Sequence, residues 1–151
     1  MKKYVPLIII FVTLLEILNS CKKSSTQTQK NVALLTNQSW AILSIQERVN
    51  HGSWIDIYTG FQICTTDNKL LFKIDNSYNW DEGPTKCNPS DPQTYAYGTW
   101  SLSSDGSKLF TNNGTTTTDV DIALLDNSNL ITVKNLISGT DTINIETKYV
   151  H

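Results

Sequence analysis

Six short clusters of turn-forming residues divide the chain beyond residue 37 into segments of strand length. They are Thr66-Asp67-Asn68, Asp75-Asn76-Ser77, Ser104-Asp105-Gly106, Asn112-Asn113-Gly114, Asp126-Asn127-Ser128 and Ser138-Gly139-Thr140. Asp-Gly and Asn-Gly are strong signals for tight hairpins, because type I′ turns require positive φ at both central residues. A chain divided this regularly is expected to fold as consecutive antiparallel strands.

Several segments between these turns alternate apolar and polar side chains, as half-buried strands do. Leu70, Phe72 and Ile74 share one face, and Lys69 and Lys73 occupy the other. Three further segments show the same period of two, with apolar residues at Trp100 and Leu102, at Val120, Ile122 and Leu124, and at Ile143 and Ile145. After residue 37 the helical signal amounts to at most one turn near residues 55–63.

These patterns predict an all-β fold, an antiparallel up-and-down meander of about eight strands. The strand segments lie near residues 38–48, 54–57, 69–74, 77–82, 95–103, 107–111, 117–125 and 129–136, with 142–150 as a last addition. A sheet of this size usually closes or folds over to remove its edges, which gives a small barrel or a sandwich. The length of 151 residues suits one such domain.

The N-terminus has the layout of an export signal. Met1-Lys2-Lys3 forms a short basic region, and residues 4–18 are a mainly apolar stretch. This stretch is shorter than the roughly 20 residues that a transmembrane helix needs, and it has the length of a signal-peptide core.

The end of this stretch, Leu18-Asn19-Ser20-Cys21, resembles the signal of bacterial lipoproteins. In that signal a branched apolar residue lies three before the cysteine and a small residue directly precedes it. The resemblance implies cleavage before Cys21, a thioether-linked diacylglycerol on its sulfur, and a further chain such as palmitate on its amine. Two or three chains hold a protein firmly to a membrane, whereas one binds reversibly. An ordinary signal peptide that contains a cysteine, or an uncleaved anchor, is the alternative.

The residues that follow Cys21 are polar, and residues 22–31 contain no apolar side chain. We therefore expect three parts, which are a signal peptide at 1–20, a lipidated cysteine with a flexible polar tether at 21–36, and a β domain at 37–151. Lys22, rather than an aspartate, follows Cys21, which argues against retention at the inner membrane. We expect an outer-membrane location facing the periplasm, and the sequence leaves surface exposure open.

Cys64 and Cys87 are expected to form a disulfide bond. If Asp75-Asn76 is a two-residue hairpin loop, paired residues have numbers that sum to 151, so the two cysteines face each other at the open end of the hairpin. The compartment that the signal predicts permits such a bond. A redox pair or half of a metal site is the alternative, although the chain has no Cys-x-x-Cys and no histidine at metal-ligand spacing from a cysteine.

Residues 36–150 resemble the lipocalin-like domains of small Bacteroidetes lipoproteins. The matching elements, in order, are Trp40, Cys64-x-x-Asp67, Leu71-Phe72, Tyr78 with Gly83, Cys87, Gly98-Thr99-Trp100-Ser101-Leu102, and Asp105-Gly106 with Leu109. The resemblance implies an eight-stranded antiparallel barrel with a disulfide bond where Cys64 and Cys87 stand. It implies no enzyme activity.

An eight-stranded barrel is just wide enough to be filled by side chains or to hold one small ligand. The candidate inward residues, and hence the candidate ligand contacts, are Trp40, Phe72, Trp100, Val120 and Ile122, with Leu124 beside them. They form either a dry core or the wall of a partly open cavity for a lipid-like or small aromatic molecule.

A second aromatic set consists of Trp54, Trp80, Tyr95 and Tyr97. Tyr95 and Tyr97 are expected to face away from Trp100, because neighbouring positions alternate along a strand. Such rings either form a rim that binds proteins or glycans by stacking, or simply cover the sheet and the loop joined by the cysteines.

Residues that could carry chemistry do not form a convincing catalytic or metal site. Asp119 and Asp121 lack the further oxygen donors of a calcium site, and Asp81 and Glu82 are adjacent and point to opposite faces of a strand. No nucleophile elbow, phosphate loop or zinc-protease motif occurs. A net charge of -2 is too weak for an electrostatic nucleic-acid binder. We therefore expect no enzyme activity, no cofactor, no metal and no nucleic-acid partner.

The sequence thus predicts a membrane-anchored lipoprotein with a lipocalin-like, non-catalytic binding domain for a small apolar ligand. The alternative is a solid-cored structural, accessory or inhibitor module that binds a protein or glycan through its loops and aromatic rim.

Overall fold

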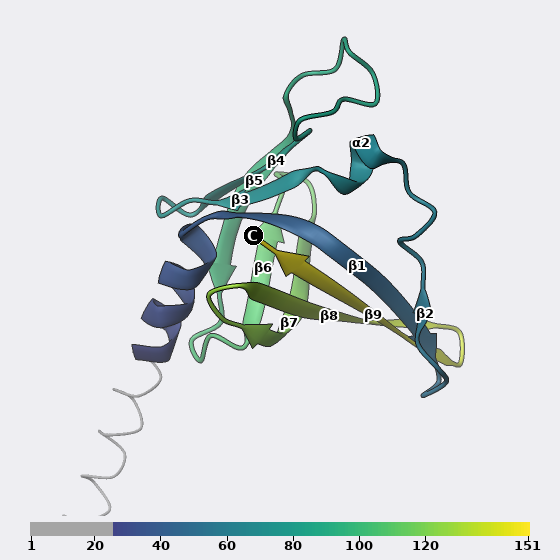
Figure 1. Ribbon diagram of the computed structural model, residues 1–151. Coiled ribbons are helices and arrows are strands. Elements are labelled where there is room, and N and C mark those ends of the chain that lie inside the picture. The colour runs from purple at the N-terminus through teal and green to yellow at the C-terminus, as the bar shows by residue number, and fades with distance from the viewer. Residues whose placement is uncertain (1–25) are drawn as a thin grey trace, which may run out of the picture.

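The computed structural model describes residues 26–151, which form a helix over residues 26–36, nine strands and one further helical turn (Figure 1). The strands and the turn are β1 (Ser39–Val49), β2 (Ile55–Asp56), α2 (Ile63–Thr66), β3 (Lys69–Phe72), β4 (Ser77–Asp81), β5 (Thr94–Leu102), β6 (Lys108–Asn112), β7 (Thr117–Leu125), β8 (Asn129–Ser138) and β9 (Asp141–Val150). In this part of the chain no helix is long and apolar enough to cross a membrane. The predicted signal peptide at 1–20 and the lipidation site Cys21 lie outside the described residues.

Sequential antiparallel pairing runs from β3 to β9, and β1 closes the sheet by pairing with both β3 and β9. The first residues of β1, Ser39–Ala41, pair with β3, and the rest of the strand pairs with β9. The two-residue strand β2 adds to β1 outside this ring of eight strands. The predicted up-and-down meander and the small lipocalin-like barrel are both confirmed.

The β3–β4 hairpin differs from the prediction by one residue. Leu70 pairs with Trp80 and Phe72 with Tyr78, so paired numbers sum to 150 instead of 151. The loop therefore has three residues, and Asn76 in it has a positive φ of 65°. Ile74 belongs to this loop and is 76% exposed, so the prediction that it shares the inner face with Leu70 and Phe72 was wrong.

Leu124 also departs from the predicted alternation. The pairing of β7 with β8 shifts register between Ile122 and Leu124, which marks a β-bulge. A bulge inserts one extra residue and turns the following side chains to the other face of the strand. Leu124 is consequently 42% exposed, and the prediction that it faces inward was wrong.

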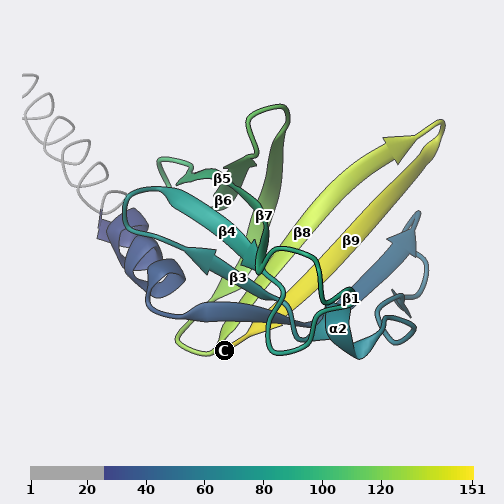
Figure 2. The same cartoon turned by 90° about the horizontal axis from the view of Figure 1, so that it is seen from above.

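Strands β7 and β8 pair only from Asp121 to Leu125, so the N-terminal half of β7 and the C-terminal half of β8 separate. The β8–β9 hairpin continues beyond this point (Figure 2), and β1 remains paired with β9 as far as Val49 and Ile143. Lys134 spans the gap, with its ammonium 2.8 Å from the Asp119 carboxylate and donating to the Asp119 carbonyl oxygen at 2.7 Å. The barrel is thus closed around its middle and splayed at one end.

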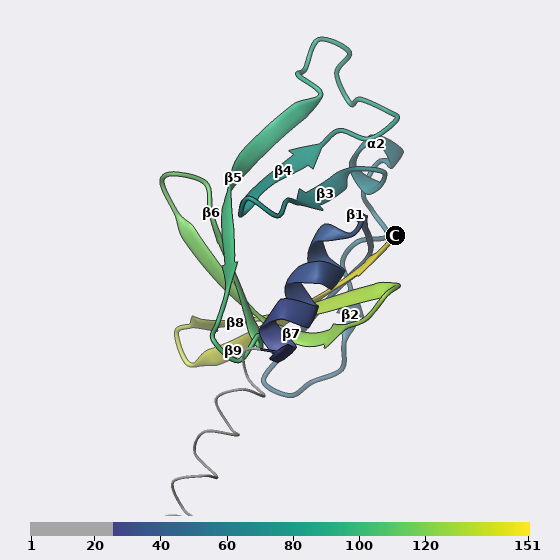
Figure 3. The ribbon, with the colours of Figure 1, turned by 90° about the vertical axis from the view of Figure 1, so that its left-hand side faces the viewer.

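Residues 26–36 are helical and lie against the barrel, which corrects the prediction of a flexible tether over this part of 21–36 (Figure 3). Leu35 is fully buried in the core, and Asn31 donates to the Gly106 carbonyl oxygen at 3.0 Å. Thr28 donates to the Ser104 carbonyl oxygen at 2.8 Å. These three contacts fall on one face of the helix, and docking on the barrel stabilises a helix whose first half, residues 26–31, has no apolar side chain.

Candidate functional site

The interior of the barrel contains a cavity of about 160 Å³. Its wall comes from six strands, and the lining residues are Leu70, Phe72, Tyr78, Trp80, Leu109, Thr111, Thr118, Val120, Leu130, Thr132 and Tyr149. Most of this wall is aliphatic or aromatic, and threonine and tyrosine hydroxyls interrupt it. A mainly apolar pocket with a few polar groups is the usual form of a small-molecule site.

Two of the five predicted ligand contacts, Phe72 and Val120, line this cavity. Trp40 and Trp100 belong instead to the buried core, and Ile122 packs against that core while partly exposed. The sequence therefore identifies which strand residues face inward. It does not show which of them line the cavity and which belong to the packed core.

Trp40 and Trp100 help to fill the end of the barrel that the helix covers. The Trp40 indole donates to the Leu35 carbonyl oxygen at 3.0 Å, and the His151 ring lies against it at 3.8 Å between centroids. The Trp100 indole donates to the Lys73 carbonyl oxygen at 3.0 Å and meets the Phe72 ring edge-on at 5.4 Å. With both indole N–H groups satisfied, this end is a closed core, and Phe72 separates it from the cavity.

An aromatic wall borders the cavity toward the opposite end of the barrel. The Trp80 ring lies 6.5 Å from the Tyr149 ring and 6.5 Å from the Tyr95 ring, between centroids. A register shift between Trp80 and Asp81 brings Tyr95 to this position. Of the second predicted aromatic set, Trp80 therefore lines the cavity and Tyr95 packs beside it.

The other two members of that set lie elsewhere. Tyr97 is 75% exposed on the outside of β5. Trp54 is partly exposed next to β2, and the Arg48 guanidinium lies 4.5 Å above its ring. These two rings are separate surface features and do not belong to the cavity wall.

Tyr149 supplies a buried hydroxyl to the cavity wall. Burial raises the pKa of Tyr149 to about 12, while a hydrogen bond with the Thr132 side chain opposes the shift. The charges of Tyr58 and Tyr95 raise the same pKa further. Tyr149 therefore presents a neutral hydroxyl at ordinary pH.

Glu82 lies just beyond this aromatic wall. Its side chain is only 8% exposed, and its backbone N–H donates to the Gln93 carbonyl oxygen at 2.8 Å. Within residues 26–151, its carboxylate oxygen Oε2 is buried without a hydrogen-bond partner. The charge of Glu82 contributes to a raised pKa of Tyr95, for which burial is the main cause.

Asn68 connects Glu82 to Tyr95. Its side-chain amide lies 3.3 Å from the Tyr95 hydroxyl. In the orientation that satisfies this amide, its nitrogen donates to the carbonyl oxygens of Cys64 and Glu82, at 3.1 and 2.9 Å. Its oxygen then faces the Tyr95 hydroxyl. Every polar atom of this amide is then satisfied, and the Glu82 carboxylate receives none of its hydrogens.

A second carboxylate, that of Asp67, lies close to Gly83, the residue that follows Glu82. Gly83 has a positive φ of 67°, and a Cβ built on it would overlap the Asp67 backbone carbonyl and lie 3.2 Å from Asp67 Oδ1. Asp67 Oδ2 accepts hydrogen bonds from the Thr85 backbone N–H and hydroxyl. Its Oδ1 is buried and has no partner among the described residues. Asp67 and Glu82 thus each keep one buried carboxylate oxygen without a partner among the described residues.

The disulfide bond between Cys64 and Cys87 is confirmed, with the two Cα atoms 5.0 Å apart. It joins α2 to the loop after β4, beside Asp67 and Glu82. Nearby, the Tyr58 hydroxyl donates to the Thr66 carbonyl oxygen at 3.4 Å. Joined cysteines are not free to act as metal ligands, and residues 26–151 contain no group of three or more His, Cys, Asp or Glu side chains that could hold a metal.

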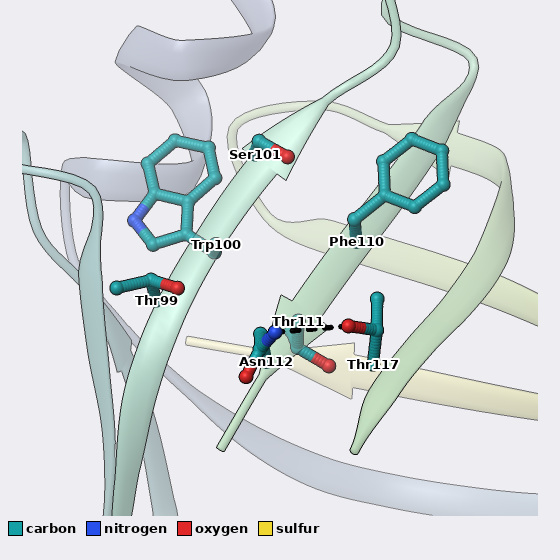
Figure 4. A pocket seen from close by; sticks show the side chains of 7 residues that line it. All are labelled: Thr99, Trp100, Ser101, Phe110, Thr111, Asn112 and Thr117. Atoms are coloured by element: carbon teal, nitrogen blue, oxygen red, sulfur yellow. Dashed lines mark hydrogen bonds between the residues drawn. The ribbon is translucent and has the colours of Figure 1, made fainter. Parts of the chain in front are cut away.

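A groove of about 400 Å³ lies on the outer wall of the barrel over β5, β6 and β7 (Figure 4). Its side chains are mostly hydroxyl or amide groups, and Asn112 donates to the Thr117 hydroxyl at 2.9 Å. Figure 4 shows the Trp100 and Phe110 rings turned away from each other, so they do not form a common aromatic surface. This open, uncharged groove is a weaker candidate than the cavity inside the barrel.

Sequence reasoning missed Tyr149 and Glu82 as members of this site, and it placed Trp80 in the second aromatic set instead of among the cavity contacts. Alternation could have found Tyr149, since it continues the odd-numbered apolar series from Ile143 and Ile145 along β9. In the sequence Glu82 stands out only as a neighbour of Asp81, and adjacent residues of a strand face opposite ways, so no local signal points to its role in the site.

Comparison with models of protein families finds no match to this chain, and no curated protein sequence matches it.

Proposed function

We propose that this barrel is a non-catalytic binding module that holds one small, mainly apolar molecule in its interior. The observation that carries the proposal is the cavity of about 160 Å³, with its aromatic and aliphatic wall and a few hydroxyls. A wholly filled barrel, the alternative considered from the sequence, would leave no such space at the level of Phe72 and Val120.

The size of the cavity limits the ligand. A cavity of about 150 Å³ in a protein core is known to hold benzene, whereas drug-sized ligands occupy about 300–1,000 Å³. A cavity of about 160 Å³ therefore fits one six-membered ring with a short substituent. Between the two ligand classes expected from the sequence, this volume favours the small aromatic molecule over a long lipid chain.

Native mass spectrometry of the exported Cys21→Ala chain tests the proposal. A mass increment that is present in the native spectrum and lost on denaturation would identify a bound molecule and its size. If native and denatured masses agree, the protein should be titrated with single-ring compounds such as 2-phenylethanol while its melting temperature is followed. A ligand that binds only the folded state raises this temperature. No increment and no shift at millimolar concentration would contradict the proposal.

We further propose that Cys21 is lipidated and anchors the domain to the outer membrane, facing the periplasm. Support comes from the basic start, the apolar stretch and the Leu18-Asn19-Ser20-Cys21 sequence. Since the described helix already includes residue 26, Cys21 is at most about 18 Å of extended chain from it. The barrel would then be held close to the bilayer.

Fractionation of the Cys21→Ala variant tests this anchor. The unmodified chain is expected in the membrane fraction and the variant in the soluble periplasmic fraction. Persistent membrane association of the variant would show that another part of the chain is the main attachment.

A further inference from the structure

We propose that the molecule held in the barrel carries a protonated amine, and that Glu82 receives this amine at the end of the cavity bordered by Trp80. The inference rests on the proposed binding function and adds the chemical class of the ligand. It starts from a buried carboxylate that the protein does not satisfy.

Glu82 occupies the position two residues after Trp80, on the same face of the chain. Side chains alternate along an extended strand, so residues 80 and 82 point to the same side. Trp80 lines the cavity, and the 8% exposure of Glu82 agrees with a side chain directed into the barrel. Glu82 follows the last residue of β4 and does not itself line the cavity, so the proposal places its carboxylate just beyond the Trp80 ring.

Burying a carboxylate is unfavourable unless hydrogen bonds and an opposite charge compensate it. Among the described residues, Oε2 of Glu82 and Oδ1 of Asp67 are buried and have no hydrogen-bond partner. The ion pairs found in the same part of the chain join Lys108 and Lys134 to Asp119 and Asp121, and none includes Glu82 or Asp67. A group that both donates hydrogen bonds and carries positive charge would satisfy this end of the barrel.

The rings around Glu82 suit the same kind of group. The Tyr95 and Tyr149 rings both lie near Trp80, with each centroid 6.5 Å from that of the Trp80 ring. The faces of such rings attract cations, and the attraction strengthens when the site is desolvated. Asn68 joins the Tyr95 hydroxyl to the Glu82 backbone carbonyl, so Glu82 lies near this wall, in keeping with the effect of its charge on the pKa of Tyr95. An ammonium on a short arm would then lie between aromatic faces and a carboxylate, while the ring that bears it fills the apolar cavity.

Two probes of equal size separate the charge from the shape of the ligand. 2-Phenylethylamine and 2-phenylethanol have the same ring and arm, and they differ in an ammonium against a hydroxyl. Titration calorimetry at neutral pH with the exported Cys21→Ala chain measures both. We expect the amine to bind at least about tenfold more tightly, because hydrogen bonds to charged groups are stronger than neutral ones.

Two variants test whether Glu82 causes the tighter binding of the amine. Glu82→Gln keeps the size of the side chain and removes its charge, so the amine and the alcohol should then bind with similar affinity. Asp81→Asn is the matched control, because it removes one negative charge from the adjacent residue, whose carboxylate accepts from the Gly83 N–H and the Gln93 amide. The control should keep the preference for the amine. Circular dichroism verifies that both variants retain the β fold.

The possible outcomes are distinguishable. If the alcohol binds and the amine binds no better, the amine inference is overturned and the proposed binding function stands. If neither probe binds at millimolar concentration, the binding of ring-sized ligands fails, and the amine inference fails with it. A preference that survives Glu82→Gln, or disappears in Asp81→Asn, would overturn the assignment to Glu82. Should Glu82→Gln fail to fold, the comparison of the two probes on the parent chain decides.

Discussion

The indole nitrogen of Trp40 donates to the carbonyl oxygen of Leu35 at 3.0 Å, which joins the last turn of the N-terminal helix to the first inward residue of β1. Both side chains are fully buried. The bond satisfies the Trp40 N–H and also one of the carbonyls that a helix leaves unpaired at its C-terminal end. The helix over residues 26–36 is therefore part of the folded domain.

Replacing Leu35 by alanine is expected to lower the free energy of unfolding by about 2–5 kcal/mol, as large-to-small changes in a packed core do. Gln29→Ala, at an exposed position of the same helix, is the control and should change it by less than about 0.5 kcal/mol. Urea unfolding followed by tryptophan fluorescence measures both values. A Leu35→Ala protein as stable as the control would mean that residues 26–36 act only as a tether.

How far the sequence predicts this fold depends on where each element obtains its stability. The strands could be predicted because turn residues and a period of two are local signals, and every predicted strand segment is present. The helix over 26–36 could not, because its polar residues Thr28 and Asn31 are held by carbonyls of the β5–β6 turn, far away in the sequence. The bulge near Leu124 is likewise set by pairing between strands, which alternation along one strand does not show.

Gly83 offers a direct test of the close approach to Asp67. Gly83→Ala introduces a Cβ that overlaps the Asp67 backbone, at a positive φ of 67°. Gly139→Ala is a matched control, since Gly139 has a φ of 64° and nothing within 4 Å of an added Cβ. The control should lose about 1–2 kcal/mol from the backbone conformation alone.

The Gly83 variant should lose at least about 1 kcal/mol more than the control, because overpacking adds to the backbone term. Thermal and urea unfolding of the two variants side by side give the difference. Equal losses would show that the contact between Gly83 and Asp67 relaxes freely, and they would weaken the view that Asp67 and Glu82 are held together.

The disulfide bond should contribute about 3 kcal/mol in the chain-entropy model, because it closes a loop with a sequence separation of 23. Cys64→Ser combined with Cys87→Ser is therefore expected to lower the melting temperature and to leave the β-sheet circular dichroism spectrum in place. A reducing agent should lower the melting temperature of the parent chain and leave that of the double variant unchanged. Equal melting temperatures of the oxidised parent chain and the double variant would contradict a stabilising bond.

The candidate site was less predictable than the fold. Alternation identifies which side chains face inward, and Phe72 and Val120 were found in this way. Whether inward side chains meet or leave a space depends on their volumes across the barrel, and this is fixed only when eight strands close. Glu82 shows the same limit, since its importance comes from the link to Tyr95 through Asn68 and from the contact of Gly83 with Asp67, which join segments that are separate in the sequence.

The buried hydroxyl of Tyr149 predicts a loss of stability at alkaline pH. Burial raises the pKa of Tyr149 from 10.0 to about 12, so between these values the folded state keeps a proton that the unfolded state releases. The free energy of unfolding must then fall as the pH rises through this window, by up to about 2–3 kcal/mol. Tyr149→Phe keeps the ring and removes the ionisable group. Urea unfolding at several pH values between about 9 and 12 should therefore show a shallower decline for Tyr149→Phe than for the parent chain, while other alkaline groups affect both equally. Parallel curves would mean that the hydroxyl ionises freely in the folded protein, and that the cavity wall at Tyr149 is open to water.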